Sequence, residues 1–365
     1  MAETAAKPNV TARRQRALRA ARTLFTPLLP DDYLELINPL WSTRELRGRI
    51  ERISPEADGA VSLLIRPGFE WPGHRPGQYL RIGVVVDGVH HWRAYSLTTE
   101  PGRPDGCIGI TPKLVPSGVV SPYLTQRARP GDVVRLGGVE GTFVLPSPPL
   151  RRALFVSAGS GITPIVSMLR SLDRADALTD VVHVHSARTA ERVIFGEHLR
   201  ELASRRKGLR LHLQLTGEQG RLAAADLDRL CPDWRTRETF ASGPGEMLDA
   251  LRARWQAEGD PARLSIERFQ PIVGGNGATA AGGRVRFLAS GIETECGGGT
   301  PILLAGEEAG AQLPSGCRMG ICRTCVGRLR AGAVRDLRTG EVHDTPNETV
   351  RTCVNAPEGK VEIEL

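Results

Sequence analysis

Long apolar stretches are missing from this 365-residue sequence. No window approaches the roughly 18 uninterrupted apolar residues of a membrane-spanning helix, and the first thirty residues lack the apolar region of a secretory signal peptide. We therefore expect a cytoplasmic protein without a transmembrane segment. Aromatic residues make up only 5% of the chain, and no nucleic-acid motif or run of aromatics accompanies its basic residues, so we expect no nucleic-acid partner.

Cysteine is also scarce, and its odd number, seven, argues against a framework of disulfides. Cys317, Cys322 and Cys325 follow a C-x4-C-x2-C spacing, and Cys353 stands alone farther along the chain. Three ligands on one loop with a distant fourth are typical of a plant-type [2Fe–2S] cluster. The alternative is structural zinc, which usually takes two short cysteine pairs.

The sequence around these cysteines extends the pattern. The loop GCRMGICRTC follows the helix-like TPILLAGEEAGAQLP and precedes the closing VRTCVNAPEGKVEIEL. The segment from Gly283 to Leu365 resembles the plant-type ferredoxin family. The resemblance implies an α+β β-grasp domain over residues 284–365 and one-electron transfer, with the four cysteines as metal ligands.

Residues 45–148 consist of short alternating runs, such as AVSLLIRP and DVVRLGGV, separated by Gly and Pro at intervals of roughly ten residues. This pattern predicts an antiparallel barrel or sandwich. Three segments stand out within it: RPGQY at 75–79, RAYS at 93–96 and KLVPSGVVS at 113–121. Because proline cannot donate to a strand ladder, Pro112 predicts an edge or a bulge next to the third segment.

Together these segments resemble the flavin-binding domain of the ferredoxin–NADP reductase family. The resemblance implies an antiparallel β-barrel that binds FAD. Arg93 would pair with the flavin pyrophosphate, Tyr95 would lie against the isoalloxazine ring, and Ser96 would offer its hydroxyl to the N5 edge as a candidate catalytic group. The resemblance also assigns cofactor-binding roles to Arg75 and Gln78 on a strand beneath the ring, and to Lys113, Gly118 and Ser121 around a short helix at the pyrophosphate.

Residues 149–269 change to an alternation of apolar strands and helical stretches, which predicts an α/β domain with a doubly wound parallel sheet. The first strand, ALFVSA, leads into GSGITP at 159–164, which resembles the glycine turn of the same reductase family. We expect Gly159, Gly161 and Thr163 to bind the pyrophosphate of a pyridine nucleotide at the start of a helix.

The end of the second predicted strand is where this fold reads the adenosine ribose. Ser186, Arg188 and Arg192 offer a hydroxyl and two cations suited to a 2′-phosphate, so we expect NADPH, with NADH as the alternative. Both arginines would otherwise only solvate a loop.

Two later segments concern the nicotinamide and the tether to the last domain. ASGP at 241–244 resembles the C-G-P segment of the family, with Ser242 in place of Cys as a second candidate catalytic residue and Gly243 beside it. Phe269 either shields the flavin face or closes the core of its domain. Residues 270–283 are rich in Gly and Ala and predict a flexible linker.

The net charge of +7 is concentrated near the start of the chain. Residues 1–44 form a basic extension, and Thr11 to Phe25 predicts a basic amphipathic helix. Such a helix suits peripheral contact with an anionic membrane surface. The alternatives are a solvated extension that packs on the next domain, which we favour, and an organelle transit peptide.

We expect an oxidoreductase of three domains that passes electrons from NADPH through FAD and a [2Fe–2S] cluster to an external acceptor protein. The overall arrangement resembles bacterial reductases that serve membrane di-iron acyl-CoA desaturases and hydroxylases, which we expect as the acceptor. The alternatives are a soluble oxygenase, either a ring hydroxylase or a cytochrome P450, and a redox sensor without turnover.

Overall fold

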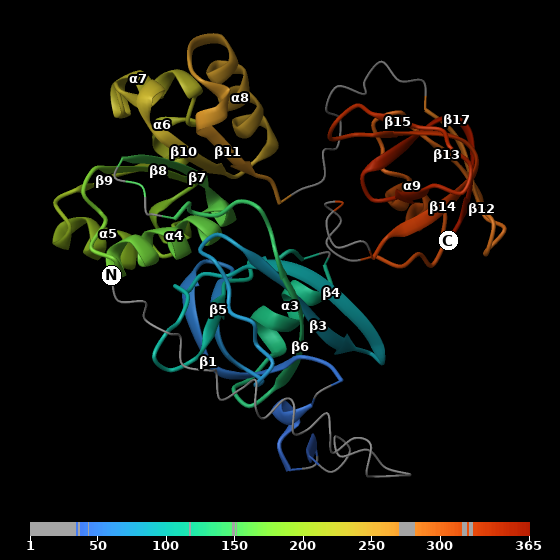
Figure 1. The fold of residues 1–365 in the computed structure, drawn as a ribbon, viewed down its shortest axis with the longest axis horizontal. Helices are drawn as coiled ribbons and strands as arrows, with labels where there is room; N and C mark the ends of the chain where they lie inside the picture. The colour runs from blue at the N-terminus through green and yellow to red at the C-terminus, as the bar shows by residue number, and fades with distance from the viewer. Residues whose placement is uncertain are drawn as a thin grey trace, which may run out of the picture.

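The structure is a computed structural model that describes residues 34–35, 37–42, 44–116, 118–147, 150, 152–269, 282–315, 320 and 324–365. Its strands form three sheets that follow one another along the chain (Figure 1). The basic N-terminal segment 1–33 and the linker residues 270–281 lie outside the described residues. No helix in the described part of the chain has the length and apolar character needed to cross a membrane.

The first sheet is antiparallel and has the strand order β4-β3-β6-β1-β2-β5. Its outer strands meet at a bridge between Leu97, just after β4, and Ile110 in β5, so the sheet closes into the predicted barrel. Pro112 follows β5, which is an edge strand of the hydrogen-bonded order, as the proline predicted. The strands are β1 (Arg47–Ala57), β2 (Ala60–Pro67), β3 (Tyr79–Val86), β4 (Val89–Ser96), β5 (Ile108–Ile110) and β6 (Val133–Glu140), with short helical turns η1 (Pro39–Trp41), α3 (Val120–Pro122) and η2 (Tyr123–Arg127).

The second sheet is parallel throughout, with the order β11-β10-β7-β8-β9. Helices α4 and α5 pack on one face, and α7 and α8 pack on the other (Figure 1). The strands are β7 (Ala153–Ala158), β8 (Val181–Ala187), β9 (Leu209–Leu215), β10 (Glu238–Ser242) and β11 (Leu264–Glu267). The helices are η3 (Gly159–Gly161), α4 (Ile162–Arg174), η4 (Ala190–Arg192), α5 (Gly196–Arg205), α6 (Thr216–Gln219), η5 (Ala224–Asp226), α7 (Leu227–Leu230), η6 (Trp234–Thr236), α8 (Gly245–Glu258) and η7 (Pro261–Arg263).

The first two domains share one hydrophobic core. Phe143 and Leu145, which follow the barrel, lie in the same buried cluster as the apolar face of α4. The ring of Phe143 meets Phe240 of β10 edge to face at a centroid distance of 5.6 Å. Burial of these side chains therefore ties the barrel to the parallel sheet.

The third sheet is mixed, because β12 and β17 run parallel while its other pairs are antiparallel. Helix α9 (Ile302–Glu308) packs on it through Ile302 and Ala305, which gives the α+β arrangement that the sequence predicted. The strands are β12 (Gly283–Phe287), β13 (Glu293–Cys296), β14 (Val326–Asp336), β15 (Val342–His343), β16 (Thr349–Arg351) and β17 (Asn355–Glu364).

A close backbone approach limits one position of the third sheet. A Cβ atom on Gly283 would lie 1.7 Å from the carbonyl oxygen of Gly359, which belongs to β17. We expect Gly283→Ala to force the strands apart and destabilise this domain by about 1–3 kcal/mol. Its calorimetric transition should fall by roughly 5 °C or more. Gly297→Ala is the control, because its nearest contact would be 3.3 Å away, and an equal shift in both variants would contradict the assignment.

Candidate cofactor-binding sites

The end of strand β4 groups the three residues expected to contact a flavin. Tyr95 is half-buried against the barrel core, and burial raises the pKa of its hydroxyl well above the usual range, which keeps it neutral. Arg93 Nη1 donates to the carbonyl of Trp92 at 2.8 Å, and Ser96 is only 6% exposed. One short stretch thus presents a cation, an aromatic ring and a hydroxyl, which suit the phosphate, the ring and the polar edge of a flavin.

The segment containing Arg75 and Gln78 is a turn that leads into β3, and the expectation of a strand there was wrong. Gly77 has φ +96°, which breaks the extended conformation. The amide of Arg75 donates to Gln78 Oε1 at 2.7 Å, and Gln78 Nε2 donates to the carbonyl of Gly141 at 3.3 Å. Arg75 Nη2 donates to the carbonyl of Leu145 at 3.1 Å, so both side chains hold the turn against the exit from the barrel.

The loop with Lys113, Gly118 and Ser121 follows β5. Ser121 Oγ accepts from the amide of Val115 at 3.1 Å, and the amide of Gly118 donates to the carbonyl of Val115 at 2.9 Å. The expected short helix is present as α3, which begins at Val120. Lys113 is exposed, so its ammonium group is accessible to an anion. Ser121 therefore closes the loop on which the expected pyrophosphate contacts lie.

The glycine turn after β7 approaches the end of β10 very closely. Gly159 has φ +54°, and a Cβ on Gly161 would lie 2.1 Å from the carbonyl oxygen of Ser242. A Cβ on Gly243 would meet Ala158 at 3.2 Å. Thr163 Oγ1 donates to the carbonyl of Ser160 at 3.0 Å and so supports the turn itself. A side chain at Gly161 would clash with β10, so glycine permits the close packing of this turn at the start of α4, where an anion would be expected.

Strand register aligns polar residues next to this turn. Ser242 pairs with Ser157 of β7 on one side and with Glu267 of β11 on the other. Ser242 Oγ is fully buried and has no hydrogen-bond partner among the described residues. A buried hydroxyl without a partner is costly, which makes Ser242 an unusual position at the end of β10.

Ser157, the partner of Ser242 on β7, contacts two buried histidines. Its Oγ lies 2.9 Å from His183 Nε2 and 2.8 Å from His185 Nδ1. Burial lowers the pKa of His185 to about 4, and it lowers that of His183 too. Both imidazoles are therefore neutral at physiological pH. Sequence reasoning missed this cluster, because only strand pairing reveals that Ser157 lies beside β8.

The three residues expected at the adenosine 2′-phosphate differ in their burial and in their hydrogen-bond or ion-pair partners. Ser186 is buried at the end of β8, and Arg188 is exposed in the following loop. Arg192 instead forms an ion pair with Asp58 of the barrel domain, with Nη2 3.0 Å from Oδ2. Because this ion pair is solvent-exposed, the expectation that Arg192 contacts the nucleotide stays a prediction.

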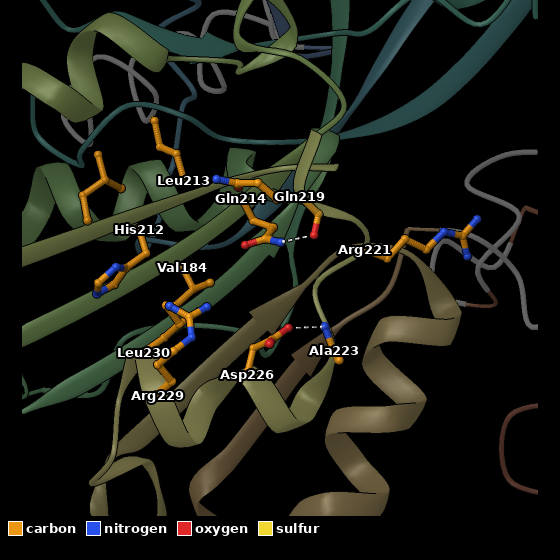
Figure 2. A pocket seen from close by; sticks show the side chains of 11 residues that line it. Val184, His212, Leu213, Gln214, Gln219, Arg221, Ala223, Asp226, Arg229 and Leu230 are labelled. Carbon is orange, nitrogen blue, oxygen red and sulfur yellow. Dashed lines mark hydrogen bonds between the residues drawn. The ribbon is translucent and has the colours of Figure 1, made fainter. Parts of the chain in front are cut away.

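A pocket of about 630 Å³ lies between β9 and the helical segment that follows it (Figure 2). Ser186 does not line this pocket, although it pairs in the sheet with Gln214, which does. Figure 2 shows Gln214 hydrogen-bonded to the carbonyl of Gln219, at 3.2 Å, and Arg221 at the rim. Sequence reasoning did not select Arg221 and Arg229, which line the pocket together with the carboxylate of Asp226; Arg221 is also ion-paired with Glu246 of α8.

Phe269 is half-buried and lies two residues beyond the end of β11. The neighbouring Arg268 is ion-paired with Asp249 of α8. Both interpretations of Phe269, as a shield for the flavin or as a core residue, stay predictions.

Two of the four predicted metal ligands lie in the described residues, and Cys317 and Cys322 lie outside them. Cys325 and Cys353 are each 1% exposed, and their Sγ atoms are 2.7 Å apart without forming a disulfide. Thr352 secures this approach, because its amide and its hydroxyl each donate to the carbonyl of Cys325 at 2.9 Å. Thiols that converge in a buried site from 28 positions apart fit a shared iron–sulfur cluster.

Comparison with protein families identifies each domain. Residues 70–145 match the oxidoreductase FAD-binding domain, residues 155–252 match the oxidoreductase NAD-binding domain, and residues 286–358 match the 2Fe-2S iron-sulfur cluster binding domain.

Relatives extend over nearly the whole chain. An NADPH oxidoreductase of Mycobacterium tuberculosis is 46% identical over 95% of this chain and 91% of its own length. The chain belongs to the ferredoxin reductase family. A glycine betaine monooxygenase reductase subunit of Pseudomonas aeruginosa is 30% identical over 80% of this chain and 87% of its own length. The phthalate dioxygenase reductase structure shares the fold, with a TM-score of 0.61 and 22% identity over 87% of this chain and 97% of that chain.

This ferredoxin reductase is therefore an oxidoreductase with FAD-binding, NAD-binding and [2Fe–2S] domains. The expected fold class, an antiparallel barrel, a parallel-sheet domain and a ferredoxin-like domain, is confirmed. The residues at the end of β4, the glycine turn and the buried thiols fit the three groups that these domains bind.

The carboxyl group beside Ser242 predicts a dependence of stability on pH. Burial raises the pKa of Glu267 to about 7, so the folded protein retains a proton that the unfolded chain releases near pH 4.5. The contribution of Glu267 to the free energy of unfolding therefore declines as the pH rises from about 4.5 to 7. We expect Glu267→Gln to be more stable than the wild type at pH 8, by up to about 3 kcal/mol, and equal to it below pH 4.5.

Thermal unfolding of both proteins across this pH range measures the effect. Glu197→Gln on the exposed side of α5 is the matched control and should show no pH-dependent difference. A constant difference between Glu267→Gln and the wild type at every pH would show that the carboxyl does not titrate in this range.

Proposed function

We propose that the chain is the reductase component of an oxygenase system, which transfers electrons from NADPH to a separate oxygenase protein in the cytoplasm. The observation that carries this proposal is the order of the three domains in one chain, together with relatives that are reductase subunits of a monooxygenase. The flavin, when bound, supplies the conversion of a two-electron donor into single electrons for the cluster. A sensor without turnover would not need the nucleotide-binding domain.

The residues of the chain bind and orient the reacting groups. Arg93 would neutralise the flavin pyrophosphate, and Tyr95 would support the ring. Ser96 would offer its hydroxyl to the N5 edge of the flavin. Ser242 would lie next to the nicotinamide. None of these side chains acts as a nucleophile.

The coenzyme that we propose is NADPH. The M. tuberculosis relative is named an NADPH oxidoreductase, and Arg221 and Arg229 line the pocket next to β9. Arg188 and Arg221 would face the 2′-phosphate, for which Arg221 would exchange its exposed ion pair with Glu246; Arg192 is likewise paired, with Asp58. Phosphate is recognised well by guanidinium groups.

The acceptor that we propose differs from the first expectation. None of the relatives described above supports a membrane desaturase, and the name of the M. tuberculosis relative specifies no acceptor. The soluble oxygenase, our alternative, has the support of the monooxygenase reductase subunits. Peripheral membrane contact has no such support, and the basic segment expected to make it lies outside the described residues.

Electron transfer to a one-electron acceptor tests the function. We expect the purified protein to contain FAD, iron and sulfide, and to reduce cytochrome c with NADPH. Cys353→Ser should lose cytochrome c reduction yet keep the bleaching of its flavin by NADPH, because only the cluster is affected. Cys107→Ser is the control, since Cys107 lies in the barrel domain.

The same protein should then support turnover by a soluble oxygenase component. Membranes that contain a desaturase are the second arm of the experiment. Electron delivery to the desaturase alone would reject the proposed acceptor, and a flavin that NADPH and NADH both fail to reduce would reject the function.

The coenzyme proposal makes a separate prediction. We expect Arg221→Gln to lower kcat/KM for NADPH by about tenfold and to leave kcat/KM for NADH within twofold, because one charge-assisted contact with the 2′-phosphate is lost. Steady-state kinetics with both coenzymes measure this ratio. Arg252→Gln, an exposed arginine of α8, is the control. An equal loss with NADPH and NADH would place Arg221 away from the 2′-phosphate.

A further inference from the structure

Helix α4 contacts both domains that take part in hydride transfer. Its first turn is the glycine turn proposed to bind the nucleotide. Its later residues face the segment 97–102, which directly follows the flavin residues of β4. The helix therefore connects the two proposed cofactor sites through side-chain hydrogen bonds to the segment after β4.

Three donors on one side of α4 hold this segment. Ser167, Arg170 and Arg174 are spaced three and four residues apart, which places them on a common face. Ser167 Oγ donates to the carbonyl of Thr99 at 2.8 Å, and Arg170 Nη1 donates to the carbonyl of Thr98 at 2.7 Å.

Arg174 extends the same row of contacts. Its Nη1 donates at 2.9 Å to the carbonyls of Pro101 and of Gly102. The side chains on one helix face thus bind four of the five carbonyls of residues 98–102.

The guanidinium group of Arg170 is itself fixed from two further directions. Its Nε donates to His198 Nε2 at 3.2 Å, and its Cζ lies 5.0 Å from the centre of the Phe195 ring. Burial and the nearby Arg170 charge lower the pKa of His198 to about 4, so the imidazole is neutral and can accept the hydrogen bond. Glu56 of β1 provides compensating negative charge from the barrel side.

The segment held by Arg170 has little freedom of its own. Thr98 and Thr99 are 2% and 4% exposed, and the amide of Thr98 donates to the carbonyl of Gly109 at 2.8 Å. The carbonyl of Thr99 also accepts a hydrogen bond from His74 Nε2 at 3.1 Å. A displacement of Thr98 would therefore also displace Leu97 and Ser96, because no flexible loop separates these residues.

We infer that Arg170 is a positioning residue for hydride transfer, which fixes the nicotinamide site relative to the flavin site by binding the carbonyl of Thr98. This inference rests on the proposed function, because it requires nucleotide at the glycine turn and flavin at β4. The rate of hydride transfer depends steeply on the separation of donor and acceptor, and a misplacement of about 1 Å can cost roughly 100-fold.

Arg170→Gln removes the charge and shortens the side chain, so that it cannot hold Thr98 and His198 together. We expect the limiting rate of flavin reduction by NADPH, measured by anaerobic stopped flow, to fall about 10–100-fold. The dissociation constant of NADPH should stay within twofold, because the glycine turn is unchanged. With NADPH deuterated at the transferred position, the isotope effect on reduction should persist, since the hydride step stays rate-limiting.

A second measurement does not depend on activity. Hydrogen exchange of the peptide covering residues 97–109 in the full-length protein should be faster in Arg170→Gln than in the wild type. Arg170→Lys keeps the charge and one hydrogen bond to Thr98, and we expect it to recover part of both properties.

Arg206→Gln is the matched control. Arg206, which follows α5, binds Asp173 of α4, with Nε 2.6 Å from Oδ1. This ion pair lies within the parallel-sheet domain, whereas Arg170 also binds the barrel domain. An unchanged limiting rate in Arg170→Gln, an equal loss in Arg206→Gln, or a loss of NADPH affinity alone would overturn the inference.

Further outcomes separate a failure to fold, a failure of the inference and a failure of the proposed function. If Arg170→Gln does not fold, Arg170→Lys and Ser167→Ala decide in its place, by the same two measurements. A wild-type flavin that NADPH cannot reduce would refute the proposed function itself. A wild-type flavin that is reduced at the same rate as in the variants would refute only the role of Arg170.

Discussion

The packing of helix α4 between the barrel and the parallel sheet is the constraint on which both proposed redox sites depend. Its apolar face lies in the buried cluster that also contains Phe143 and Leu145. Its polar face binds the carbonyls after β4, and its first turn lies against the end of β10. Since close-packed interiors resist displacement, this arrangement defines the geometry of the two sites together.

The candidate cluster site of the ferredoxin-like domain depends on contacts within that domain. Its site depends on two buried thiols held by hydrogen bonds to Thr352 and on a mixed sheet closed by the parallel pair β12 and β17. A linker rich in glycine precedes it in the sequence. Covalent attachment raises the effective concentration of one redox centre near another, so a single chain can relay electrons without binding a separate carrier.

Much of this organisation was predictable, because the relevant signals are local. The glycine turn, the RAYS segment and the cysteine spacing each depend on neighbouring residues, and sequence reasoning placed the first two on the correct type of element. The failures concern contacts between distant segments. Arg75 and Gln78 were expected on a strand, but Gly77 turns the chain there, and their side chains bind Gly141 and Leu145. The ion pair between Arg192 and Asp58 of the other domain was likewise not predictable from the sequence, although it leaves the expected nucleotide contact of Arg192 a prediction.

The sequence by itself determined the three domains, their order and the chemical types of the groups they bind, since strand and helix periodicity, glycine turns and ligand spacing are properties of short segments. Only the tertiary structure decided which charged and polar side chains are occupied by protein partners and which are left for a ligand. Ser242 has no partner among the described residues, while Ser157 binds two histidines and Arg170 binds Thr98. These differences arise from strand register and domain packing, which bring together residues that are far apart in the chain.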